Sequence, residues 1–131
     1  MKFAEADASH PVHSVKQLEA DIAGVKTLFF AEKFSDRILI LISQTGKIGT
    51  IIQAAREITM DGNPSFTVQT LLGAPSEDLS LDLCARRIIE SVAMTSTTSL
   101  PVLLCVSLQG TSVPQEHVKR LVEIVEENKV W

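Results

Sequence analysis

The first half of the chain consists of short apolar segments separated by clusters of turn-forming residues. Within most segments, apolar and polar residues alternate with a period of two, which is typical of β-strands. Ala23 with Gly24, and the Gly-, Asn- and Pro-rich residues 60–65, are predicted turns. The predicted strands cover residues 14–22, 25–34, 37–44, 48–54 and 66–73.

The hydrophobic period changes after Pro75, where a helix is predicted over residues 76–94. Its apolar side chains recur at the spacing of one helical face. They are Leu81, Cys84, Ala85, Ile88 and Val92. Ser76 is the predicted N-cap, and Glu77 and Asp78 place acidic charge in the first turn, where the helix dipole favours it.

The remaining segments predict one more strand and a second helix. Residues 100–108 are apolar on both faces and predict a sixth strand, and residues 115–131 return to helical spacing. The apolar positions of this helix are Val118, Leu121, Val122 and Val125. The order of five strands, helix, strand and helix predicts an α+β fold, a six-stranded antiparallel sheet with two helices on one face. Thr45, Gly46 and Lys47 are then the turn of a hairpin between the third and fourth strands.

The third predicted strand is apolar at every position from Ile38 to Ile42, so both of its faces carry apolar side chains. Two helices of about 16 residues can cover only one face of such a sheet. Leaving the other face in water would forgo roughly 1.5–3 kcal/mol per side chain. We therefore expect the sheet of another subunit to cover it. The sequence does not show which of the two sets of side chains faces that subunit, Leu39 and Leu41 or the three isoleucines between and beside them. The candidates for the contact are Ile38, Leu39, Ile40, Leu41, Ile42 and, in the next strand, Ile51.

Composition and charge narrow the class of protein. The chain has 131 residues, 45% hydrophobic and 21% charged, which is ordinary for one soluble domain. We expect a flexible N-terminal tail at residues 1–12 and a single domain over residues 13–131. A net charge of −4 provides no basic footprint, so a nucleic acid partner is not expected. No apolar run approaches the roughly 20 residues of a membrane span, so membrane insertion is not expected either.

The cysteines and the N-terminal segment bear on the compartment. Cys84 and Cys105 each lie inside an apolar pattern and are predicted to be buried free thiols, as in a reducing compartment. The first 13 residues include acidic side chains and lack the apolar core of a signal peptide. We expect a cytoplasmic protein, and the same features are compatible with the nucleus.

Gly46 and Lys47 follow a strand, as the Gly-Lys pair of a phosphate-binding loop does. However, Leu41 stands where that loop has its first glycine, and Ile48 where it has the Ser or Thr that holds magnesium. The loop is also expected to close a hairpin rather than to open a helix. A nucleotide site is therefore not predicted.

The other reactive side chains also fail to form a site. His10, His13 and His117 have no Cys or carboxylate cluster to complete a metal shell. Cys84 lies on an apolar helix stripe, whereas a reactive thiolate needs partial exposure and a lowered pKa. The sequence therefore predicts no catalysis, no metal and no cofactor.

Trp131 follows the second amphipathic helix and has two interpretations. It could complete the core, or it could insert into a partner, because Trp is enriched at the centres of interfaces.

Two motifs and a closing segment occur together in this chain. ILILISQTGKIGT contains Gln44, Gly46, Lys47, Ile48, Gly49 and Thr50, and TVQTLLG contains Val68, Leu71, Leu72 and Gly73. The later segments PVLLCVSL and RLVEIVEENKVW extend the similarity over residues 14–131. In this order the segments resemble the proteasome assembly chaperone 3 family.

The resemblance implies a non-catalytic chaperone with an antiparallel sheet that dimerises through its sheets. Members of the family pair with a companion, chaperone 4, and the dimer helps to assemble the alpha ring of the 20S proteasome before it leaves. When alone, the chain is expected to pair with itself. In this framework Gly46 adopts a positive φ, Gly49 allows a close backbone approach, and Lys47 is either a contact to an alpha subunit or a solvated turn lysine.

Two other classes of function compete with this interpretation. A dimeric scaffold of the small sheet-plus-helix type, in GTPase regulation or trafficking, would also need a covered second face. A small enzyme or ligand carrier would use the sheet face as a pocket, but the apolar strands lack convergent polar groups.

Overall fold

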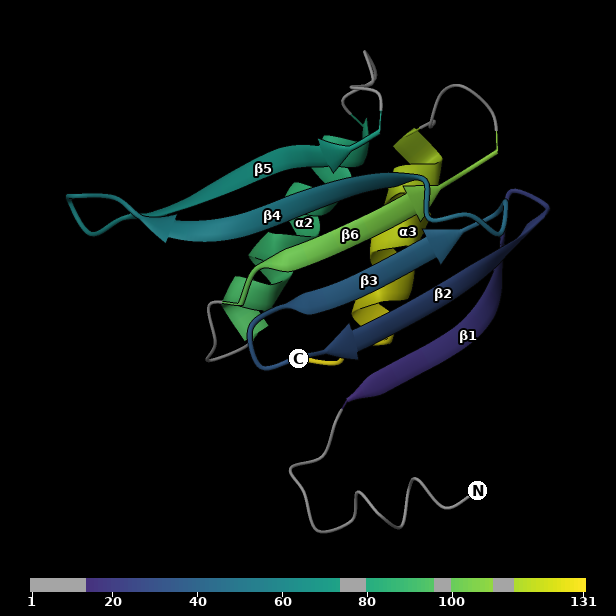
Figure 1. Cartoon of the computed structure of the whole chain (residues 1–131), viewed down its shortest axis with the longest axis horizontal. Coiled ribbons are helices and arrows are strands. Elements are labelled where there is room, and N and C mark those ends of the chain that lie inside the picture. The colour runs from purple at the N-terminus through teal and green to yellow at the C-terminus, as the bar shows by residue number, and fades with distance from the viewer. Residues whose placement is uncertain (1–13, 74–79, 96–99, 110–114) are drawn as a thin grey trace, which may run out of the picture.

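The computed structural model describes residues 14–73, 80–95, 100–109 and 115–131. Six strands and two helices follow one another in the predicted order (Figure 1). The strands are β1 (Val15–Ile22), β2 (Val25–Lys33), β3 (Ile38–Ser43), β4 (Thr50–Ile58), β5 (Pro64–Leu72) and β6 (Val102–Ser107). The helices are α2 (Ser80–Thr95) and α3 (Gln115–Glu127). The predicted N-terminal tail and the predicted N-cap at Ser76 lie outside the described residues.

The strands form one sheet in the order β1-β2-β3-β6-β4-β5. The α+β class with a mostly antiparallel six-stranded sheet is confirmed, but the sheet is mixed, because β3 and β6 run parallel. The predicted hairpin between the third and fourth strands is wrong: β6 lies between β3 and β4 (Figure 1). The physical reason is the composition of β6, which is apolar on both faces and is therefore buried best at the centre of the sheet.

The boundaries differ most in the β4–β5 hairpin. β4 begins at Thr50 and continues to Ile58, beyond the predicted end at Ala54, and β5 already begins at Pro64. The turn between them is closed by a hydrogen bond from the amide of Thr59 to the carbonyl oxygen of Asn63, at 2.9 Å. The hairpin therefore extends past the helices at one end of the sheet (Figure 1).

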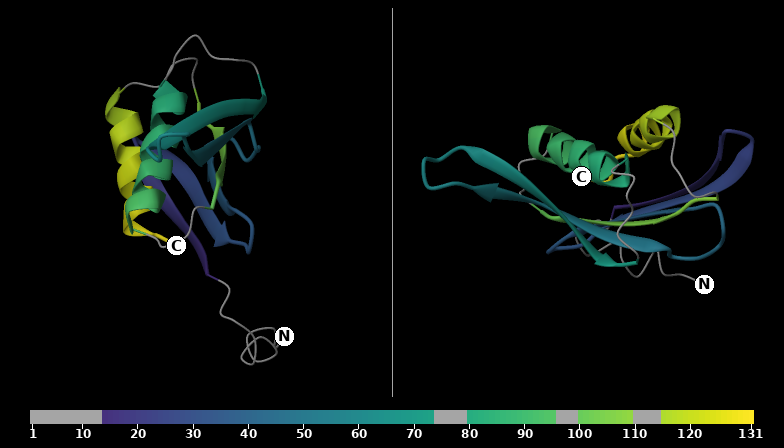
Figure 2. Two further views of the ribbon diagram at one scale, coloured as in Figure 1. Left: turned by 90° about the vertical axis from the view of Figure 1, so that its left-hand side faces the viewer. Right: turned by 90° about the horizontal axis from the view of Figure 1, so that it is seen from above.

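Both helices pack on the same face of the sheet (Figure 2). The predicted apolar stripes are the buried ones: Cys84, Ala85, Ile88 and Val92 in α2, and Val118, Leu121, Val122 and Val125 in α3. Leu81 is half-buried against the same core. Helix α3 ends at Glu127, four residues before the predicted end. Among the described helices, none is long and apolar enough to cross a membrane.

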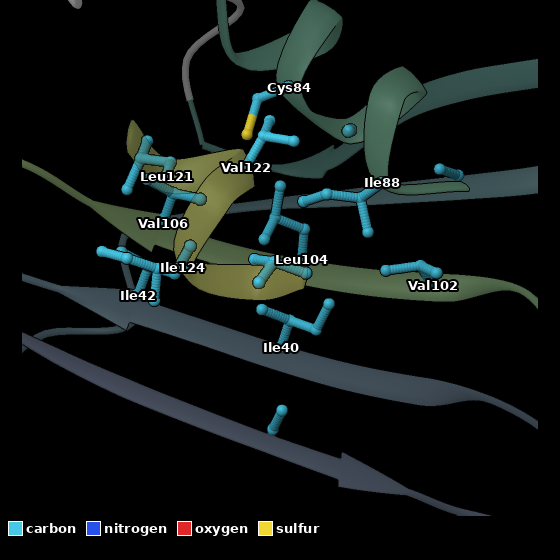
Figure 3. Packing of buried hydrophobic residues seen from close by; sticks show 14 of the residues in the cluster. Ile40, Ile42, Cys84, Ile88, Val102, Leu104, Val106, Leu121, Val122 and Ile124 are labelled. Atoms are coloured by element: carbon cyan, nitrogen blue, oxygen red, sulfur yellow. The ribbon is translucent and has the colours of Figure 1, made fainter. Parts of the chain in front are cut away.

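The core between helices and sheet determines which side of each strand is covered. Ile38, Ile40 and Ile42 of β3 are at most 1% exposed. Ile40 and Ile42 point toward the helices with Leu104 of β6 (Figure 3). This answers the question that the sequence left open, namely which side chains of β3 face the helices. Ile38, Ile40 and Ile42 belong to the core, and Leu39 and Leu41 face the other side of the sheet.

Candidate protein-interaction surface

The face of the sheet opposite the helices, here called the open face, carries an apolar row. The strand registers place one residue of each strand side by side across the whole sheet. This central row consists of Gln17, Phe30, Leu41, Cys105, Ile51 and Leu72 in the spatial order of the strands. Five of its six members are apolar, so the row forms a continuous apolar strip.

The strip is accessible to different degrees along its length, and Cys105 at its centre is only 6% exposed. Leu72 is 61% exposed, and its neighbour Leu71, beside an irregularity in the β4–β5 register, is 48% exposed. Phe30, Leu41 and Ile51 are half-buried, because adjacent members of the row shield one another. Large apolar strips of this kind on a soluble protein typically mark an interaction site.

A second row beside the central row is mixed in character. The registers place Val15, Glu32, Leu39, Leu103, Gln53 and Gln69 next to one another on the same face. Its centre, Leu39 and Leu103, continues the apolar strip, and Gln53 and Gln69 are exposed polar side chains. The open face thus has an apolar centre and a polar border, the arrangement found in protein interfaces.

Residues 44–49, here called the crossover loop, connect β3 to β4 across the carboxyl end of β6. The amide of Gln44 donates to the carbonyl oxygen of Ser107 at 2.7 Å. The side chain of Gln44 donates from Nε2 to Thr27 Oγ1 and accepts from the amide of Gln109, both at 3.0 Å. Ser43 Oγ donates to the carbonyl oxygen of Lys47 at 2.8 Å. These bonds hold the loop against the sheet.

The two glycines of the loop confirm the expected roles. Gly46 has φ = +78° and Gly49 has φ = +74°, a region that L-residues rarely adopt. A Cβ atom at Gly49 would collide with the carbonyl oxygen of Val106 and would lie 2.6 Å from the Cβ of Ser107. Gly49 therefore allows the loop to approach β6 closely.

The loop presents two side chains to solvent. Lys47 is exposed, and Ile48 is 56% exposed beside it. Because the backbone around them is held by several hydrogen bonds, they project from an ordered position rather than from a free turn.

The predicted contact residues divide into two groups. Leu39, Leu41 and Ile51 lie on the open face, whereas Ile38, Ile40 and Ile42 lie beneath the helices. Trp131 is half-buried and packs against the core cluster. Its role at a partner stays a prediction.

Sequence reasoning missed several residues of the open face, namely Phe30, Leu103, Cys105 and Leu72. The alternation in TLFFAEKF was a signal for Phe30, which is half-buried between the buried residues Phe29 and Ala31. The other residues belong to β6 and β5. Their place on the open face depends on which strands β6 and β5 pair with, and the sequence did not show this pairing.

The thiols are not activated. Burial raises the pKa of Cys84 from 9.0 to about 12, although the charge of Arg87 opposes the shift. Burial also raises the pKa of Cys105. Both cysteines are free and buried, as predicted. Thiols with raised pKa values are poor nucleophiles at neutral pH.

In the described part of the chain no metal-binding cluster is present, and the pocket beside Gln53 is small. It contains no group of three His, Cys, Asp or Glu side chains that could hold a metal ion; His10 and His13 lie outside it. A pocket lined by Asp36, Arg37, Gln53 and Leu103 has a volume of about 90 Å³. Sites for small ligands usually measure about 300–1,000 Å³, so this pocket does not favour a ligand carrier.

Fold and surface together define an α+β protein with helices on one sheet face and an apolar strip on the other. The family model for Proteasome assembly chaperone 3 matches residues 40–128. A protein named Proteasome assembly chaperone 3 from Bos taurus is 30% identical over 123 residues, covering 92% of this chain and 97% of the relative. The chain belongs to the proteasome assembly chaperone 3 family.

Further comparisons agree with this assignment. The Proteasome assembly chaperone 3 of Homo sapiens is 28% identical, with the same coverage of both chains. The protein of that name from Nematostella vectensis is 31% identical over 119 residues, covering 83% of this chain and 84% of the relative.

A solved structure described as a novel chaperone complex for yeast 20S proteasome assembly has a similar fold. Its TM-score is 0.64 at 14% identity, covering 89% of this chain and 98% of that one. This likeness concerns the fold. The role, chaperoning of proteasome assembly, is that of the family to which the chain belongs. The scaffold alternative finds no support in these comparisons.

Proposed function

We propose that this chain is a non-catalytic chaperone of 20S core particle assembly that works as a dimer with a companion resembling chaperone 4. The dimer promotes formation of the alpha ring and then dissociates. The observation that carries the pairing step is the apolar central row, which the helices of this chain leave uncovered.

The energetics of the open face support pairing. Full burial of a large apolar side chain contributes roughly 1.5–3 kcal/mol. Covering Phe30, Leu41 and Ile51, which are already half-buried, and the exposed Leu72 would contribute part of this gain for each side chain. This contribution counts against a cost of association of about 4–15 kcal/mol. A second sheet is the natural cover, because sheets pack face to face about 10 Å apart through their side chains. In the absence of the companion, the same face would allow a homodimer.

Contacts to alpha subunits require different properties from the pairing face. An assembly factor must leave, so this contact is expected to be polar and modest in area. Lys47 and Ile48 on the crossover loop are the candidates, because they are exposed and their backbone is held in place. The free thiols of Cys84 and Cys105 support a reducing compartment, the cytoplasm or nucleus.

The experiment is native mass spectrometry of the tagged chain purified from its own cells. We expect a dimer with a second small chaperone, together with alpha-type proteasome subunits in part of the preparation. Leu41→Asp places a charge in the central row and is expected to release the companion.

The matched control is Leu83→Asp on α2, where the leucine is 40% exposed and lies away from the open face. This variant is expected to retain the companion. Recovery of the chain as a monomer, or with trafficking or GTPase proteins, would contradict the proposed function.

A further inference from the structure

The apolar strip of the open face is bordered by acidic side chains. The alternation along the strands places Glu19 and Asp21 of β1, Glu32 of β2 and Glu57 of β4 on this face. Glu19, Asp21 and Glu57 are exposed, and Glu32 is half-buried. The acids lie on both sides of the central row: Glu19 and Asp21 on one side, and Glu32 and Glu57 on the other.

Basic side chains on the same face are fewer, and they are paired within the chain. Lys26 Nζ lies 2.9 Å from Glu19 Oε2, and an Arg37 guanidinium nitrogen lies 3.0 Å from Asp36 Oδ2 at the end of β3. Apart from Lys47 on the crossover loop, the other basic residues of the described part lie at helix-side positions of strands, on the helices or just after α3. They are Lys16, Lys33, Arg56, Arg86, Arg87, Lys119, Arg120 and Lys129.

Two identical copies meeting through this face would bring like charges together. A symmetric dimer uses the same patch on both subunits, so the acidic borders of both copies would lie in one interface. The Lys26–Glu19 and Arg37–Asp36 pairs are each neutral, so the repulsion between two copies would come mainly from Asp21 and Glu57. Like-charge juxtaposition across an interface disfavours a partner, whereas complementary charge favours it.

We propose that the open face selects a partner of different sequence, whose apolar sheet face is bordered by lysine or arginine side chains. The acidic border acts as the specificity determinant: it weakens self-pairing of this chain and favours the mixed dimer. This inference rests on the proposed function, since it takes the open face as the pairing face.

The test uses a variant of this chain as a partner of known charge. Glu57→Lys with Gln69→Lys gives a copy whose central row is intact and whose border is more basic by three charges; both residues are exposed. Native mass spectrometry of an equimolar mixture with ¹⁵N-labelled wild-type chain counts mixed and like dimers. Spectra are taken in dilute and in concentrated ammonium acetate.

At low salt we expect mixed dimers to exceed random mixing about threefold to tenfold, as several weak surface charge pairs would produce. Concentrated salt shortens the screening length and is expected to return the mixture to random proportions. The matched control carries Met94→Lys and Glu126→Lys, the same change in charge at exposed helix positions, and is expected to mix randomly throughout. Random mixing of the basic copy at low salt, or absence of any dimer at both salt concentrations, would overturn the inference.

Leu41→Asp in both copies separates this inference from the proposed function. If the dimers persist with Leu41→Asp, the open face is not the pairing face and the proposed pairing fails. If the dimers are lost with Leu41→Asp but the basic copy mixes randomly, only the charge rule fails.

Discussion

At the scale of single residues, the two glycines of the crossover loop show how similar backbone angles can have different consequences. Gly46 and Gly49 both have positive φ, at +78° and +74°. A Cβ atom at Gly46 would have no neighbour within 4 Å, whereas at Gly49 it would collide with the backbone of Val106. Only Gly49 combines conformational freedom with a close approach of two backbone segments.

Gly46→Ala is expected to reduce the free energy of unfolding by about 1–2 kcal/mol, the cost of a left-handed conformation for an L-residue. Gly49→Ala adds overpacking against β6, and we expect a loss of about 2–5 kcal/mol. Urea denaturation followed by circular dichroism measures both. Equal losses in the two variants would contradict the role of Gly49 in the close approach.

At the scale of elements, the position of β6 between β3 and β4 depends on the crossover loop. Because β3 and β4 are not neighbours, the loop must pass the carboxyl end of β6 and satisfy its own polar groups there. The side chain of Gln44 does this by linking Thr27 of β2 to the amide of Gln109 after β6. Thr27 itself is 1% exposed, so its hydroxyl needs hydrogen-bond partners within the protein.

Gln44→Ala removes both side-chain bonds and leaves the amide of Gln109 without this acceptor. We expect a loss of about 1–3 kcal/mol in the free energy of unfolding, and faster hydrogen exchange at the amide of Gln109. Gln53→Ala, at an exposed position of β4, is the control and is expected to change stability by less than about 0.5 kcal/mol. If the two variants were equally stable, the Gln44 bonds would not hold the loop.

At the scale of the whole molecule, the sheet separates two apolar surfaces, one covered by the helices and one left open. The helix side forms the core of the chain, and the open side is available to another chain (Figure 2). Neighbouring residues of β3 contribute to opposite surfaces, because successive side chains of a strand point to opposite faces. Ile40 is 0% exposed in the core, and Leu39 lies half-buried on the open face.

A pair of adjacent substitutions tests this division. Ile40→Asp buries a charge in the core, which costs several kcal/mol and approaches the whole stability of a domain, so we expect an unfolded chain. Leu39→Asp is expected to leave the chain folded and to weaken its dimer. Circular dichroism reports the fold, and light scattering reports the mass. A folded Ile40→Asp chain, or an unchanged dimer with Leu39→Asp, would contradict the assignment of the two faces.

Local patterns were sufficient to predict the elements and part of the open face. The strand and helix order, the buried stripes of α2 and α3 and the roles of Gly46 and Gly49 followed from spacing or from motif resemblance. Leu39, Leu41 and Ile51 were among the predicted contacts, but so were Ile38, Ile40 and Ile42, because an all-apolar strand carries no signal for its own orientation. Phe30 and Leu72 were missed, since their place in the row depends on strands distant in sequence.

The sequence by itself determined the local structure: which segments are strands or helices, and that the sheet has more apolar surface than two helices can cover. It could do so because side-chain periodicity is a property of neighbouring residues. Only the tertiary structure decided that β6 enters between β3 and β4, that Ile40 faces the helices, and that the acids of β1, β2 and β4 border one face. These features depend on hydrogen bonding and packing between segments many residues apart, which no local pattern encodes.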